Sequence, residues 1–242
     1  MDNNFASLQR RIQRLEEVEY RQSASARKRD LINDVRVVGA TSECHTWVTQ
    51  YTETYNEHWV EEGRPSPYEH FPDRDYFRDI FTIFDLERIV WIVKSRDLMV
   101  SWACVAYLTL EAMKVPQRGV LFQTQNHDKT RQLVKYAKTL YDRQPAWLKE
   151  AFPLVKPLRQ QPDLSLEFAH GGKIVGIPSG GDQIRSYHPW GYLLDEASFV
   201  VDAGECYNAA LSVVSGKIIL NSSAGPGWYA DARRDIIRNP EN

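Results

Sequence analysis

Short apolar runs and longer helical patterns alternate along the second half of the sequence. Runs rich in Val, Ile and Leu predict strands, because each is a few residues long and is bounded by polar or turn-forming residues. In the segment 127–143, Leu133, Ala137 and Leu140 instead recur at helical spacing and mark one buried face. The strands are predicted at 89–93, 119–124, 192–196 and 217–223, and the helices at about 101–114, 127–143 and 204–212.

The same pattern predicts the fold class. Strands that alternate with helices form an α/β domain with a mostly parallel central sheet flanked by helices. The runs VWIV and YLLD have no polar alternate position, which is typical of strands covered on both faces. LSLEFA and KIVGIPS, joined by HGG, predict one antiparallel hairpin. In such sheets ligands bind beyond the carboxyl ends of the strands.

The first part of the chain differs from this predicted core, which spans residues 88–242. Residues 1–35 predict an N-terminal helix and, at RQSASARKRD, a flexible basic linker. That helix either lies against its own domain or acts as a docking arm for a partner subunit. Residues 36–87 are rich in aromatic side chains and predict a helical lead-in that EEGRPSP interrupts. The apolar stripe of the N-terminal helix consists of Phe5, Leu8, Ile12 and Leu15.

Composition narrows the possible functions. The formal net charge of −2 over 242 residues argues against a protein that binds nucleic acid mainly through an excess of positive charge. Three widely spaced cysteines, Cys44, Cys104 and Cys206, cannot form a disulfide framework and favour a reducing compartment. No signal-peptide pattern is visible, and the longest apolar stretch, 98–113, is shorter than the ~20 residues of a membrane span. We therefore expect a cytoplasmic protein without membrane contact.

The first predicted strand leads into a polar loop and then a helix, which is the layout of a phosphate-binding loop. The usual G-x-x-x-x-G-K-[ST] pattern is absent, since Met99 and Val100 stand where Gly and Lys are expected. Ser101 can supply the hydroxyl for Mg²⁺, and Lys94, at the front of the loop, can supply the cation, with Arg96 as a second candidate. On its own, this pattern is more typical of an ordinary strand–loop–helix connection.

Two further predicted strands also end in polar residues. Asp195 and Glu196 follow a buried strand, where two acids are unfavourable without a metal or a cation. The first acid is expected to hold Mg²⁺ and the second to act as general base toward water. Arg185, in a Gly-rich loop shortly before, can stabilise a transferred phosphoryl group. After the last strand, Asn221, Ser222 and Ser223 can bond water or the γ-phosphate, or can simply form a turn.

In this order, the segments resemble the large terminase subunit of tailed bacteriophages, the ATPase that packages DNA into procapsids. The matching segments are KSRDLMVS, GIPSGGDQIRSYHP followed by YLLDEASF, and ILNSSAGPGWY, and the resemblance covers roughly residues 65–230. Members of this family often carry deviant loops, including loops with the lysine moved to the front. The resemblance implies a P-loop ATPase fold of the ASCE type.

The resemblance also implies a role for each matching residue. Lys94 matches the moved lysine, and Ser101 and Asp195 match the Mg²⁺ site. Glu196 matches the catalytic acid, and Arg185 matches the arginine finger used between subunits. The nucleotide-binding loop then comprises Lys94, Ser95, Arg96, Asp97, Leu98, Met99, Val100 and Ser101, and the coupling segment comprises Asn221, Ser222 and Ser223.

The adenine side of the expected site lies upstream of the loop in this family. Phe71, Pro72 and Tyr76 are at a plausible distance, although plain core packing explains these residues equally well.

The implied function is ATP hydrolysis that drives double-stranded DNA into a procapsid, in the host cytoplasm and transiently at the portal. The implied ligands are ATP and Mg²⁺. The implied partners are DNA, the portal protein, the small terminase subunit and further copies of the chain, which form a pentameric ring when assembled and separate to monomers when isolated. We expect no nuclease domain after the coupling segment, and therefore no DNA cleavage. Two alternatives remain: a helicase-like nucleic-acid ATPase, and a non-catalytic assembly scaffold with a degenerate nucleotide site.

Overall fold

The computed structural model describes residue 27 and residues 30–238. The chain divides into two compact units, 1–42 and 43–242. In the first unit residues 30–41 are helical, as is residue 27, so the described part of the predicted linker is helix. The predicted apolar stripe from Phe5 to Leu15 lies outside the described residues. No described helix combines the length and the apolarity that crossing a membrane requires.

A six-stranded sheet with the order β3-β8-β7-β4-β6-β5 forms the centre of the second unit. All neighbouring strands are parallel except β5 and β6, which form the expected antiparallel hairpin. The predicted α/β class with a mostly parallel sheet is therefore confirmed. The strands are β3 (Ile89–Lys94), β4 (Gly119–Gln123), β5 (Ser165–Glu167), β6 (Lys173–Gly176), β7 (Gly191–Asp195) and β8 (Lys217–Ser223).

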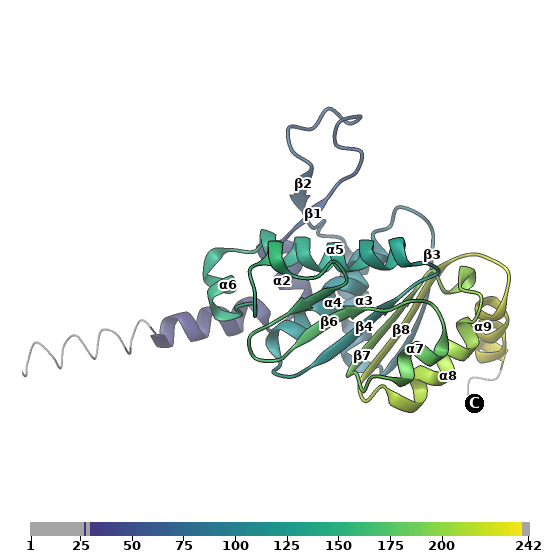
Figure 1. Cartoon of the computed structure of the whole chain (residues 1–242). Coiled ribbons are helices and arrows are strands. Elements are labelled where there is room, and N and C mark those ends of the chain that lie inside the picture. Colours follow the sequence, from purple (N-terminus) through teal and green to yellow (C-terminus); the bar gives the residue numbers. More distant parts are fainter. Residues whose placement is uncertain (1–26, 28–29, 239–242) are drawn as a thin grey trace, which may run out of the picture. The chain divides into compact units, whose positions relative to one another are not determined.

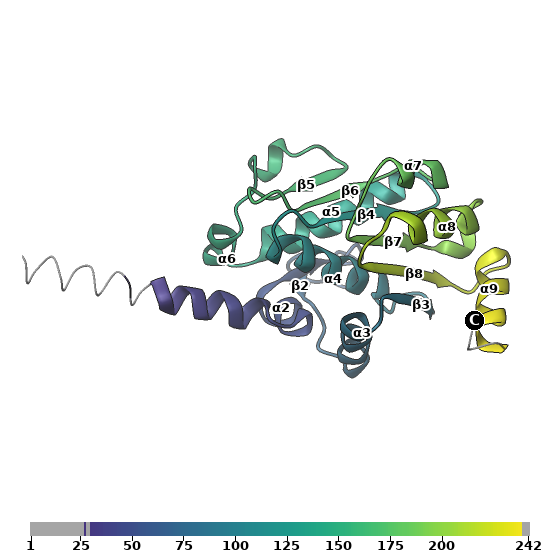
Figure 2. The same cartoon turned by 90° about the horizontal axis from the view of Figure 1, so that it is seen from below.

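Helices cover both faces of this sheet (Figures 1 and 2). One face carries α4 and α5, with α2 and α3 packed beside α4, and the other face carries α7, α8 and α9. The helix α4 is buried nearly all round, which explains why its sequence is apolar on every side. The helices are α2 (Cys44–Tyr51), α3 (Asp75–Leu86), α4 (Val100–Lys114), α5 (His127–Arg143), α6 (Ala146–Ala151), α7 (Gly181–Arg185), α8 (Ala203–Val213) and α9 (Trp228–Arg238), with 3-10 turns at Leu158–Gln160 and Ala197–Phe199.

Alternation along β7 decides which way its last side chain points. Successive strand residues face opposite sides of a sheet. Tyr192 and Leu194 belong to the cluster that packs against α8, so Leu193 and Asp195 face the α4 side. Asp195 consequently lies at the N-terminal end of α4, the helix that follows the predicted phosphate loop.

The segment before the sheet is less helical than the aromatic pattern predicts. Between α2 and α3 lies a two-stranded antiparallel sheet of β1 (Glu53–Tyr55) and β2 (Tyr68–His70). The connection between these two strands projects from the rest of the unit (Figure 1). It contains the EEGRPSP sequence, so the predicted break is a loop within a hairpin. Both strands are three residues long, which is too short to give an alternating pattern.

Candidate active site

The carboxyl ends of three adjacent parallel strands bring the predicted polar residues together. In the register of the sheet, Lys94 of β3 lies opposite Ser223 of β8, and Asn221 of β8 lies opposite Asp195 of β7. Lys94 precedes the other three residues by more than a hundred positions along the chain. The sheet topology therefore builds one polar site from the three strand ends.

The loop from Ser95 to Met99 contains two left-handed backbone positions, although it has no glycine. Asp97 and Met99 have φ angles of 62° and 53°, in the left-handed region that glycine favours. Such positions cost about 1–3 kcal/mol each for other residues and concentrate at functional sites. No side chain caps the helix that begins at Val100. The first backbone N–H groups of a helix have no carbonyl partner within the helix, so without a cap these groups are available to bind an anion.

Asp195 is held in a buried cluster. Its Oδ1 accepts hydrogen bonds from Ser101 Oγ at 2.8 Å and from Asn221 Nδ2 at 2.5 Å. The side chain is buried, and this burial raises the pKa of Asp195 to about 6, against the lowering effect of Ser101 and Lys94. The Oδ1 atom of Asn221 is buried without a hydrogen-bond partner among the described residues.

The oxygen atoms of Asp195 and Ser101 are suitable ligands for Mg²⁺. Carboxylate and hydroxyl oxygens are its preferred protein ligands, and Mg²⁺ usually takes one or two carboxylates together with the phosphates of a substrate. Ser101 and Asp195 would hold the ion. A cation beside Asp195 would offset the cost of burying its negative charge. Within the described part of the chain, no cluster of three or more His, Cys, Asp or Glu residues could bind a metal.

Glu196 is held differently. Its Oε1 accepts a hydrogen bond from Lys94 Nζ at 2.7 Å, and its Oε2 accepts from the Ser223 backbone N at 3.2 Å and from Ser223 Oγ at 2.8 Å. Burial acts to raise the pKa of Glu196, but the bonds from Lys94 and Ser223 outweigh it and the pKa is lowered. Glu196 also adopts left-handed φ and ψ angles of 54° and 43°. The site thus holds one acid whose pKa is raised and one whose pKa is lowered.

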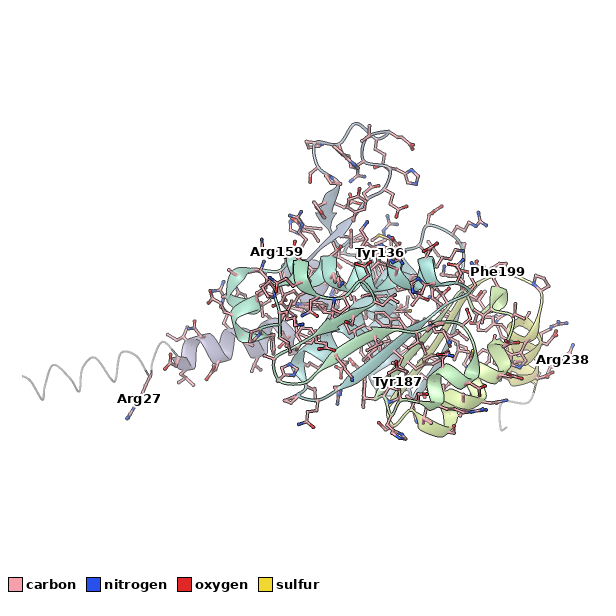
Figure 3. All side chains as sticks on the ribbon, viewed as in Figure 1. Arg27, Tyr136, Arg159, Tyr187, Phe199 and Arg238 are labelled. Atoms are coloured by element: carbon pink, nitrogen blue, oxygen red, sulfur yellow. The ribbon has the colours of Figure 1, made fainter. Side chains whose placement is uncertain are left out.

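Two cavities adjoin the loop. The first, of about 580 Å³, lies between the loop, the start of α4 and the β1–β2 hairpin. The second, of about 770 Å³, is lined in part by Glu196. Tyr136 of α5 borders the first cavity, and Phe199, just beyond Glu196, borders the second; both are labelled in Figure 3. The second cavity is lined by Glu57, Lys94, Arg96, Asp97, Gln125, Lys129, Glu196, Phe199 and Ser223.

The three residues predicted for the adenine side do not line either cavity. Phe71 is buried and packs against Phe77 with a ring-centroid distance of 4.8 Å, which is the core-packing alternative. Tyr76 donates a hydrogen bond of 3.2 Å to the Leu98 carbonyl, so it supports the loop from outside. Pro72 is partly buried. The cavity beside the loop is instead lined by residues that include Tyr55, Arg64, Arg74, Trp102 and Tyr136.

Arg185 lies at the end of α7, away from both cavities. Its side chain is exposed and pairs with Asp182 at 2.6 Å. The segment before α7 is fixed to the sheet, because buried Gln123 donates to the carbonyl of Gly180 at 3.1 Å. Arg185 therefore does not join Glu196 within one copy of the chain. Ser222, the middle residue of the predicted coupling segment, accepts a hydrogen bond from the Ser198 backbone N at 3.0 Å and stabilises the turn after Glu196.

Gln125 and Lys129 also line the second cavity, although neither is among the site residues predicted from the sequence. Both follow the carboxyl end of β4, which neighbours β7 in the sheet. The rule that identified the other three strand ends, polar residues just after an apolar run, applies equally to the sequence TQNHDK.

The fold is similar to that of solved bacteriophage large terminases. The crystal structure of the HK97 bacteriophage large terminase matches with a TM-score of 0.62 at 10% sequence identity, over 83% of this chain and 42% of that chain. The ATPase domain of the Thermus phage P74-26 large terminase gives a TM-score of 0.49 at 14% identity, over 74% of this chain and 73% of that chain. The resemblance inferred from sequence is confirmed at the level of the fold, on the first of these matches.

The chain spans less than half the length of the HK97 protein. No protein-family model and no curated protein matches the sequence.

Proposed function

We propose that this chain is a Mg²⁺-dependent ATPase, the motor domain of a phage large terminase that drives double-stranded DNA into a procapsid. One observation supports this most strongly. Lys94 contacts Glu196 and Ser101 contacts Asp195, at 2.7 Å and 2.8 Å, so a cation, a hydroxyl and two acids from separate segments form a single site. ATP hydrolysis requires this set of groups around a triphosphate.

Each residue has a defined part in the proposed reaction. Lys94 and the N–H groups at the start of α4 bind the phosphates. Mg²⁺, when bound at Ser101 and Asp195, would neutralise charge on the phosphate oxygens. Glu196 has a lowered pKa, so it is ionised at neutral pH and can orient a water molecule and accept its proton. Ser223, bonded to the other oxygen of that carboxylate, holds it in position.

The proposal extends to partners that act outside one copy of the chain. Arg185 is exposed and remote from its own Glu196, which suits an arginine that completes the site of a neighbouring subunit. We propose a pentameric ring in the assembled motor, bound to DNA, to the portal protein and to the small terminase subunit. The motor would work in the host cytoplasm at the procapsid portal, and the isolated chain would be a monomer.

Phosphate release in the presence of linear double-stranded DNA tests this function. The chain should release phosphate from Mg-ATP, linear duplex should accelerate the release, and the activity should depend on Mg²⁺. A helicase-like ATPase would instead respond to single strands and separate a duplex. Complete inactivity, with no binding of Mg-ATP, would favour the scaffold alternative and contradict the proposal.

A further inference from the structure

The cavity lined by Glu196 is also lined by a cation to which the resemblance gives no role. Lys129, in the first turn of α5, lines this cavity together with Lys94 and Arg96. Lys94 is engaged with Glu196. Lys129 and Arg96, in contrast, form no ion pair with any described residue. A positive charge that borders a cavity without a partner is available to an anion bound there.

We propose that Lys129 binds the terminal phosphoryl group of the nucleoside triphosphate. This inference rests on the proposed ATPase function and adds a specific residue to it. Lys129 would supply, from within the same chain, a positive charge at the end of the triphosphate where Glu196 acts. Arg185 lies outside this cavity, so within one copy of the chain it cannot supply that positive charge.

The backbone that carries Lys129 is firmly placed. Asn126 caps α5, because its side chain accepts a hydrogen bond of 3.0 Å from the Lys129 backbone N. The next residue, Thr130, is fully buried, and its hydroxyl donates to the Asn126 carbonyl at 3.1 Å. The first turn of the helix is therefore fixed to the core. The flexible part is the lysine stem, which can adjust to a bound phosphate.

The division between the two cavities indicates which phosphate Lys129 meets. Ser101 and Trp102 line only the first cavity, whereas Glu196 and Ser223 line only the second. Lys94 lines both, so it lies between them. A nucleotide that follows the loop therefore has its terminal phosphate in the second cavity, next to the acid that acts on water. Lys129 lines that cavity alone, so it should distinguish a triphosphate from a diphosphate.

Two acids also line the second cavity and could compete for the ammonium. The Glu57 carboxylate accepts a hydrogen bond of 3.3 Å from Gln132, and Asp97 belongs to the loop itself. Neither forms an ion pair with Lys129 within the described residues. The ammonium is therefore not neutralised by its own surroundings.

The test compares two nucleotides on matched variants. Affinities for AMP-PNP and for ADP, both with Mg²⁺, are measured by titration calorimetry on the full chain without DNA. Lys129→Gln should weaken AMP-PNP binding by about tenfold and leave ADP binding within about twofold, because one charge-assisted contact is lost with the triphosphate only. Lys129→Arg should retain most of the AMP-PNP affinity. Arg131→Gln is the control, since it removes a cation from the same helix turn that lines neither cavity.

The possible outcomes separate this inference from the proposed function. Provided that the wild-type chain binds AMP-PNP, three results would overturn the role of Lys129 alone. These are an equal loss of affinity for both nucleotides in Lys129→Gln, no loss of affinity in Lys129→Gln, and a loss of AMP-PNP affinity in Arg131→Gln equal to that in Lys129→Gln. A wild-type chain that binds neither nucleotide would overturn the proposed function, and the inference with it.

Discussion

Lys94, the last residue of β3, donates a hydrogen bond of 2.7 Å to Glu196, which follows β7, although β8 lies between these two strands. The contact is possible because both side chains reach across the carboxyl end of β8, where Ser223 bonds the same carboxylate. A lysine at the front of the loop can thus reach the site that contains Asp195 and Glu196.

Glu196→Gln should bind Mg-ATP but not hydrolyse it. The amide keeps the size of the side chain but cannot accept a proton, so turnover should fall by about 100-fold or more. Nucleotide affinity by calorimetry should change by less than about threefold. Glu150→Gln, an exposed acid on α6, is the control and should keep wild-type turnover. Normal turnover in Glu196→Gln would remove this residue from the mechanism.

Lys94→Ala should weaken nucleotide binding more than Arg96→Ala does. The Lys94 side chain is only 11% exposed and borders both cavities, whereas Arg96 is exposed and borders one. We expect a loss of about tenfold or more for Lys94→Ala and a smaller loss for Arg96→Ala, measured as Mg-AMP-PNP affinity. The reverse order would place the essential cation of the loop at Arg96.

The raised pKa of Asp195 should make stability depend on pH. Since the pKa in the folded protein is about 6, against an ordinary value of 3.8, the folded state binds the extra proton between these values. The contribution of Asp195 to the free energy of unfolding therefore falls as pH rises from about 4 to about 6. Asparagine cannot ionise. The free energy of unfolding of Asp195→Asn should therefore increase relative to that of wild type by up to about 3 kcal/mol as pH rises over that range.

Urea unfolding in EDTA at several pH values measures this difference. Asp182→Asn removes an exposed carboxylate and is the matched control, for which the difference from wild type should stay nearly constant. A constant difference for Asp195→Asn as well would show that Asp195 is ionised throughout, and would contradict the physical account of this acid.

Arg185→Ala should affect only the assembled motor. Because Arg185 lies outside both cavities of its own chain, the isolated variant should bind Mg-AMP-PNP as wild type does. DNA-stimulated turnover of the assembled complex should fall by about 100-fold or more, as expected for loss of an arginine finger. Arg159→Ala, another exposed arginine, is the control. Weakened binding in the isolated variant would contradict a role between subunits.

The strands β4, β7 and β8 could be predicted because they are buried on both faces and therefore contain continuous apolar runs. The helix α5 has the predicted bounds, His127–Arg143, since a polar N-cap precedes it and one face repeats at helical spacing. The hairpin of β1 and β2 could not be predicted in this way. Its strands are stabilised by pairing and by a network around Arg64, which bonds Glu62 and Glu69.

The site was predictable only in part. Strand ends converge whenever parallel strands are neighbours, so the pairs formed by Lys94 with Glu196 and by Ser101 with Asp195 follow once the order of β3, β8 and β7 is assumed. The surroundings of Phe71 and the cavity-facing position of Lys129 depend on how helices and loops pack. The packing of Phe71 leaves no signal in one sequence, whereas Lys129 follows the polar end of β4, which the strand-end rule could have selected.

A crystal structure of the chain with AMP-PNP and Mg²⁺ tests the central claim most directly. We predict a triphosphate on the loop of residues 95–101, with its terminal phosphate between Lys94 and Glu196 and the metal between Ser101 and Asp195. Nucleotide bound at another place, or none at saturating concentration with Lys94 still bonded to Glu196, would contradict the assignment of this site.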